Sequence, residues 1–143
     1  MEQRISFITL GVADLSRSRA FYEAMGWVAA RSGEGLGVVF FQAGGMVLAL
    51  FPHEELAHDA GVENTPASTF RGVSIAHNTR TEAEADAVMA QAVAAGGRAT
   101  KPMGKVFWGG YSGYFADPDG HLWEVCFNPF ARLADDGALY IDG

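Results

Sequence analysis

The fold of this chain is decided near its C-terminus by the run Gly-Tyr-Ser-Gly-Tyr-Phe-Ala-Asp-Pro-Asp-Gly-His-Leu-Trp-Glu-Val, which spans Gly110–Val125. Two strand-like stretches, Tyr111–Ala116 and His121–Phe127, flank the turn Asp117–Gly120. Proline presets φ at the second turn position and glycine accepts a positive φ at the fourth. The segment therefore predicts a β-hairpin whose second strand carries one carboxylate, Glu124.

The first half of the chain repeats this layout. Strand-like residues on either side of Gly44-Gly45 predict a hairpin, and Ala49 stands where Glu124 stands in the second half. Superposing the halves by their hairpins and by the glycines that end their helices pairs Phe7 with Gly72 and Ala49 with Glu124. The order strand–helix–strand–strand–strand, read twice, indicates an α+β fold built from two related modules.

Local signals place the helices between these strands. Asp14 is a predicted N-cap and Gly26 a predicted helix stop, while Thr81 and Glu84 have the spacing of a capping box. A short helical turn is expected near Glu54–His58. The remaining predicted strands are Ile5–Val12, Trp27–Arg31, Leu36–Ala43, Met46–Phe51, Arg71–His77 and Arg98–Lys101.

The domain organisation follows from this order. Residues 1–58 form the first βαβββ module, 59–69 a polar linker, 70–128 the second module, and 129–143 a C-terminal tail.

Composition excludes several functions. Apolar residues make up 49% and charged residues 19% of 143 residues, which is typical of a globular chain. A net charge of −7 provides no basic stripe, so no nucleic-acid partner is expected. The longest apolar run, Met46–Phe51, is too short to cross a bilayer, so no membrane partner is expected. The single cysteine, Cys126, is compatible with a reducing compartment, and a cytoplasmic location is expected.

Two motifs resemble a known family. The run Leu10-Gly-Val-Ala-Asp-Leu-Ser-Arg-Ser-Arg-Ala-Phe-Tyr22, followed by Gly26-Trp27, is similar to the opening of the vicinal oxygen chelate superfamily, which includes glyoxalase I, bleomycin-resistance proteins and extradiol dioxygenases. Tyr114–Glu124, preceded by Trp108-Gly109, matches its closing signature. The resemblance implies two tandem βαβββ modules whose curved mixed sheets enclose a cleft, commonly in a homodimer.

The resemblance also implies where a metal would bind. Family enzymes hold a divalent ion with side chains from the first and last strand of each module, which are here Phe7, Ala49, Gly72 and Glu124. Only Glu124 has a donor atom, and one carboxylate does not hold a transition metal against water. We therefore expect no metal ligand set and no cofactor, and the catalytic residues are unknown, with Glu124 at best in such a role.

Alternation along the predicted strands gives the residues that face the cleft. The expected ligand-binding set, extended by aromatic residues near the mouth, is Phe7, Thr9, Ala49, Phe51, Gly72, Ser74, Trp108, Tyr111, Leu122, Glu124, Cys126 and Asn128. Such a mostly apolar lining with a few polar groups suits a small-molecule ligand. The aromatic residues are either a stacking wall for that ligand or ordinary core.

Three functions remain open. The first is a metal-independent protein that holds a small, partly hydrophobic ligand between the modules, with Glu124 as polar anchor. The second is a metal-dependent lyase, isomerase or dioxygenase of the same superfamily with an atypical site. The third is a dimerisation scaffold whose cleft is filled by its own side chains. Cys126 is read as a small buried hydrophobe rather than a nucleophile.

Overall fold

The computed structural model describes residues 1, 3, 5–66 and 69–140. Residues 67 and 68 of the expected linker and 141–143 of the expected tail lie outside the described residues. The chain divides into two compact units, Met1–Thr69 and Phe70–Gly143, and each is described by itself. None of the helices among the described residues is both long and apolar enough to span a membrane.

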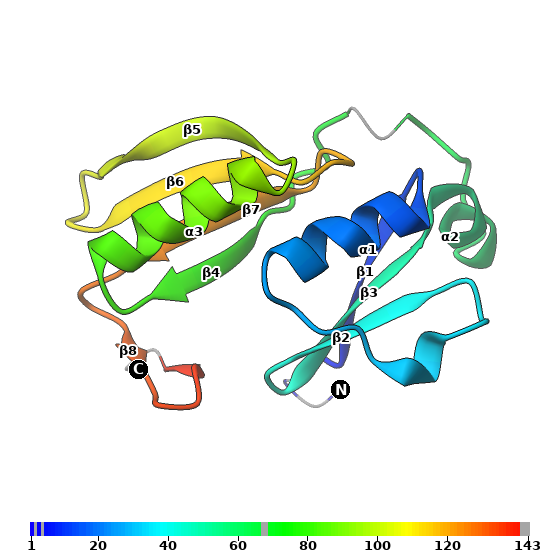
Figure 1. Cartoon of the computed structure of the whole chain (residues 1–143), viewed down its shortest axis with the longest axis horizontal. Helices are drawn as coiled ribbons and strands as arrows, with labels where there is room; N and C mark the ends of the chain where they lie inside the picture. Colours follow the sequence, from blue (N-terminus) through cyan, green and yellow to red (C-terminus); the bar gives the residue numbers. More distant parts are fainter. Residues whose placement is uncertain (2, 4, 67–68, 141–143) are drawn as a thin grey trace. The chain divides into compact units, whose positions relative to one another are not determined.

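The first unit is a three-stranded mixed sheet with two helices (Figure 1). Its strands are β1 (Phe7–Val12), β2 (Val39–Ala43) and β3 (Met46–Pro52), with β3 between the other two. The strand β1 runs parallel to β3, whereas β2 pairs with β3 as an antiparallel hairpin. Helices α1 (Leu15–Ala24) and α2 (His53–Asp59) pack on this sheet.

Asp14 begins α1 as predicted. Its carboxylate Oδ1 accepts a hydrogen bond from the amide of Arg17 at 2.9 Å. The buried face of α1 carries Phe21 and Tyr22, whose rings lie 5.1 Å apart, and Tyr22 also meets Phe41 of β2. Gly26 follows the helix with a φ of 90°, a conformation that favours glycine.

The prediction of a strand at Trp27–Arg31 is wrong. Only one isolated bridge, between Ala29 and Phe41, occurs there, and a 3₁₀ turn η1 (Arg31–Gly33) follows. Gly33 in this turn lies close to the carbonyl of Val38, where an added Cβ would be 2.5 Å from the oxygen. The first unit thus keeps the predicted element order but reduces its second strand to a single bridge.

The second unit is a four-stranded sheet in the order β4-β7-β6-β5, with α3 (Glu82–Ala94) across one face (Figure 1). Its strands are β4 (Ile75–Thr79), β5 (Arg98–Lys105), β6 (Tyr111–Ala116) and β7 (Leu122–Phe127). The strands β4 and β7 are parallel and the other pairs antiparallel. This unit therefore has the complete βαβββ order that the sequence predicted.

The diagnostic hairpin forms as its residues dictate. The amide of Asp117 donates to the carbonyl of His121 at 2.9 Å, and Gly120 takes a φ of 86°. The carboxylate of Asp117 accepts the amides of Asp119 and His121, each at 2.9 Å. Because these bonds close the turn, the register of β6 against β7 is fixed.

The beginning of α3 departs from an ideal capping box. The hydroxyl of Thr81 accepts the amide of Glu84 at 3.1 Å, but the Glu84 carboxylate accepts the amide of Arg80 rather than that of Thr81. Thr81 is the N-cap, as predicted.

The C-terminal segment forms a small hairpin of β8 (Arg132–Leu133) and β9 (Leu139–Tyr140). Arg80 tethers it to the second unit by donating from Nη2 to the carbonyls of Ala134 and Asp135, at 2.7 and 3.3 Å.

Candidate functional site

Glu124 lies on the face of the second sheet opposite to α3. Its Cα pairs with Ala76 on β4 and with Tyr114 on β6, so these three side chains share one face. The neighbouring residues Trp123 and Val125 point to the other face, where α3 covers them and Val125 is 0% exposed. The parity predicted for Glu124 is therefore the parity that the structure shows.

Tyr114 is the polar neighbour of Glu124. The two residues lie directly opposite each other on the β6–β7 ladder. Burial raises the pKa of Tyr114, and the charge of Glu124 raises it further. The hydroxyl therefore keeps its proton beside the carboxylate.

Cys126 continues the same face beyond Glu124. It pairs with Ser112 on β6, and both residues are buried. Burial raises the pKa of the Cys126 thiol, and the charge of Glu124 adds to the shift. Because the thiolate is the reactive form, this cysteine is suited to packing rather than to nucleophilic attack.

The structure moves one of the four family positions. Gly72 was placed on the first strand of the second module, but β4 begins at Ile75, and Gly72 lies before it with a φ of 71°. In the first unit Ala49 pairs with Thr9, and Phe7 lies two residues before Thr9 on the same strand. In the second unit Glu124 pairs with Ala76, and Ser74 lies two residues before Ala76. The equivalent of Phe7 in the second unit is thus Ser74, which was in the predicted binding set for a different reason.

The corresponding face of the first unit is apolar. Ala49 pairs with Thr9 on one side and with Phe40 on the other, and it is 2% exposed. The rings of Phe7 and Phe40 meet edge to face, with centroids 5.9 Å apart. Phe40 was missing from the predicted set, although alternation along its strand places it with Ala49 and places Phe41 in the core. Phe51 shares the parity of Ala49, two residues along β3.

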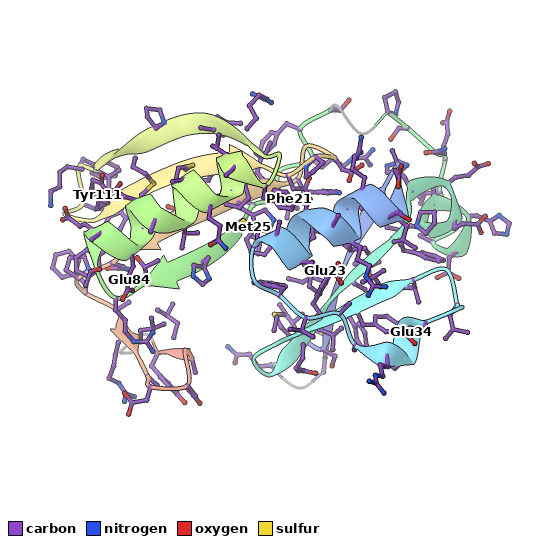
Figure 2. The ribbon with its side chains drawn as sticks, in the orientation of Figure 1. Phe21, Glu23, Met25, Glu34, Glu84 and Tyr111 are labelled. Atoms are coloured by element: carbon purple, nitrogen blue, oxygen red, sulfur yellow. The ribbon has the colours of Figure 1, made fainter. Side chains whose placement is uncertain are left out.

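Of the expected aromatic residues, Tyr114 lies opposite Glu124, whereas Tyr111 lies on the other face of the sheet. Tyr111 has the parity of Phe115, on the α3 side of the sheet, and its hydroxyl donates to Asp86 Oδ1 at 2.7 Å (Figure 2). This bond is the main cause that raises the pKa of Tyr111. Lys105 lies 5.7 Å from the centroid of the same ring and pairs with Glu82 of α3. Tyr111 and Lys105 therefore attach the β5–β6 hairpin to α3.

Three other members of the predicted set have distinct positions. The Trp108 ring lies against Gly110, where an added Cβ would be 1.9 Å from the indole. Asn128 accepts the amide of Phe130 at 2.9 Å and so closes a turn. Leu122, paired with Ala116, lies on the Glu124 face next to the carboxylate.

These positions provide few metal donors. The four family positions carry a phenyl ring, a methyl group, a hydroxyl and one carboxylate, in Phe7, Ala49, Ser74 and Glu124. Across the described ranges, no three His, Cys, Asp or Glu side chains gather closely enough to hold a metal ion. His77, on the same strand as Ala76, pairs with Val125 and so belongs to the opposite face. The residues present therefore do not fit a divalent ion of the kind that family enzymes use.

Comparison with known proteins defines the family. The family model described as Glyoxalase/Bleomycin resistance protein/Dioxygenase superfamily matches residues 4–125, and the chain belongs to this superfamily. A glyoxalase-related enzyme from Fulvimarina pelagi is 38% identical, with a TM-score of 0.89 and coverage of 99% of both chains. No protein of curated function matches.

Two more distant structures are similar as well. The hypothetical protein SA1046 from S. aureus is 26% identical over 90% of this chain and 95% of its own, with a TM-score of 0.76. A lactoylglutathione lyase from Agrobacterium tumefaciens is 25% identical over 90% of this chain and 96% of its own, with a TM-score of 0.67.

Proposed function

We propose that this chain is a metal-independent small-molecule-binding member of the superfamily, with Glu124 as its polar anchor. The observation that carries the proposal is the donor set: only one of the four family positions has a carboxylate, and the protonated phenol of Tyr114 lies opposite it on the sheet. Such a carboxylate can accept a hydrogen bond or a positive charge from a ligand. Leu122 beside it provides apolar contact, which suits a partly hydrophobic molecule.

The proposal is tested with a matched pair of probes. Benzylamine carries an ammonium group on an apolar body, whereas benzyl alcohol has the same body without the charge. We expect benzylamine to shift the NMR signals of Tyr114 and Leu122 saturably, benzyl alcohol to do so more weakly, and Glu124→Gln to remove the difference. Equal responses to both probes in both proteins would contradict the anchor.

A second function is metal-dependent lyase, isomerase or dioxygenase chemistry at an atypical site. It is favoured by the similarity to the lactoylglutathione lyase and to the glyoxalase-related enzyme. It requires metal-dependent turnover, for example of the adduct of methylglyoxal and glutathione. Turnover that EDTA abolishes and added metal restores would establish it in place of the first function.

A third function, a dimerisation scaffold, is favoured by the apolar face of the first unit, where Phe7 and Phe40 meet above the buried Ala49. The family resemblance supports a homodimer, and light scattering on the purified chain tests it. A cytoplasmic location stays a prediction of the sequence.

A further inference from the structure

The first unit contains a cavity remote in sequence from Glu124. Its volume is about 160 Å³, and it lies between the first half of α1 and the segment that connects Ala29 to Val39. Its apolar lining includes Leu15, Ala29 and Val38. All of these residues belong to one compact unit, so the cavity is complete within it.

The loop that forms the outer wall is fixed by its own backbone. The amide of Ala30 donates to the carbonyl of Phe40 at 2.8 Å, which joins the loop to β2. Two successive turns follow, with the amides of Glu34 and Leu36 donating to the carbonyls of Arg31 and Gly33 at 3.0 and 3.2 Å. A wall held by these bonds is preformed, so a ligand need not order it.

Two opposite charges line this cavity. Arg19 comes from α1 and Glu34 from the loop. The Nε of Arg19 donates to Glu23 Oε1 at 2.8 Å, one turn along the helix, which orients the guanidinium. Figure 2 labels Glu23 beside α1 and Glu34 on the loop. The hydrogen bond and charge of Glu23, together with the charge of Glu34, raise the pKa of Arg19.

The charges and the size restrict the ligand. Arg19 would attract a simple anion, but Glu34 and Glu23 would repel it. Arg19 would repel a simple cation. A molecule with both charges satisfies both sides. The volume is about half of the roughly 300 Å³ at which pockets for drug-sized ligands begin, so the molecule has few heavy atoms.

We propose that this cavity is a second binding site, which takes a small zwitterion with an aliphatic body, in the manner of a free amino acid. The carboxylate of the ligand pairs with Arg19, its ammonium group with Glu34, and its aliphatic part contacts Leu15 and Val38. This site lies in the first unit, whereas Glu124 belongs to the second.

The experiment is an NMR titration of the full chain with L-valine and two single-charge analogues. Isovalerate lacks the ammonium group of valine, and isobutylamine lacks its carboxylate. We expect valine to shift the amide signals of Gly35 and Gly37 saturably. Both analogues should bind at least about tenfold more weakly than valine, because each loses one charge-assisted contact. Arg19→Gln and Glu34→Gln should each weaken valine binding to a similar extent.

The control is Glu55→Gln, which removes an acidic side chain of α2 that does not line the cavity. It should bind valine as the parent chain does. The signals of Tyr22 and Phe41 in the core of the first unit report that each variant is folded. The proposal is overturned if valine gives no saturable response or if Arg19→Gln binds valine as tightly as the parent chain does. It is also overturned if isovalerate or isobutylamine binds as tightly as valine.

Discussion

Tyr114 and Glu124 occupy directly opposed positions on the antiparallel strands β6 and β7, and the charge of Glu124 adds to burial in raising the pKa of the phenol. Family enzymes direct the carboxylate of this strand at a metal ion, whereas here a tyrosine lies opposite it. The pair thus links the hairpin that decides the fold to the chemistry of the proposed anchor.

The first prediction concerns stability at alkaline pH. Burial and Glu124 raise the pKa of Tyr114 above the ordinary value of about 10, so the native chain keeps a proton that the unfolded chain releases. The free energy of unfolding should therefore fall as pH rises from about 10 toward the native pKa. Urea titrations should show a weaker fall for Tyr114→Phe. The matched control is Tyr140→Phe, which removes a phenol from β9 and should follow the parent chain.

The same pair predicts a spectroscopic result. In Glu124→Gln the negative charge is gone while the burial remains, so the pKa of Tyr114 should decrease without reaching its ordinary value. Ultraviolet titration of phenolate formation measures this pKa. The curve of the double variant Glu124→Gln/Tyr114→Phe is subtracted from the curve of Glu124→Gln, which leaves the signal of Tyr114. A Tyr114 pKa that does not change on removal of Glu124 would contradict the contact.

Cys126 should react slowly in the native chain. Its pKa is raised mainly by burial, so little thiolate is present at pH 8 and the thiol is covered. Iodoacetamide should label it much faster in urea than in buffer, as followed by mass spectrometry. Glu124→Gln should accelerate native labelling only slightly, because the charge is the lesser cause. Equal rates in urea and in buffer would show that the face around Cys126 is open.

The first unit should reject a carboxylate at the family position. Ala49 is 2% exposed between Thr9 and Phe40, so Ala49→Glu buries an unpaired charge. We expect a loss of roughly 3–5 kcal/mol in the free energy of unfolding at pH 7. Ala49→Gln is the matched control of equal size, and it should lose less. Acidification should reduce the difference between the two variants, since protonation removes the charge; equal losses at pH 7 would contradict this account.

Gly110 should be required for the position of Trp108. An added Cβ would lie 1.9 Å from the indole, so Gly110→Ala must displace the ring. We expect a change in tryptophan emission and a loss of about 1–3 kcal/mol in stability, as for other overpacked positions. Gly104→Ala is the control, because an added Cβ there meets nothing within 4 Å. Unchanged emission in Gly110→Ala would show that the ring does not depend on this glycine.

Local signals explain why much of the fold was predictable. The caps at Asp14 and Thr81 and the turn at Asp117–Gly120 each depend on a few neighbouring residues, and each forms as expected. The strand expected at Trp27–Arg31 was wrong: a single bridge joins Ala29 to Phe41, and a 3₁₀ turn follows. Whether a strand-like stretch pairs depends on its neighbours in the sheet, which its own residues do not report.

The equivalence of positions between the two units was predicted only in part. The sequence paired Phe7 with Gly72, but Gly72 lies before β4, which begins at Ile75. Counting back from the N-caps Asp14 and Thr81 by the same number of residues pairs Phe7 with Ser74. The strand register gives the same pair. Tyr111 was included for its aromatic character, although its parity with Phe115 places it on the α3 side.

The central claim is that Glu124 anchors a ligand and does not hold a metal ion. Calorimetric titration of the purified, EDTA-treated chain with Zn²⁺ and with Ni²⁺, in parallel with Glu124→Gln, tests it most directly. We predict that neither ion binds stoichiometrically in a way that depends on Glu124. One tightly bound ion per chain, lost in Glu124→Gln, would contradict the claim.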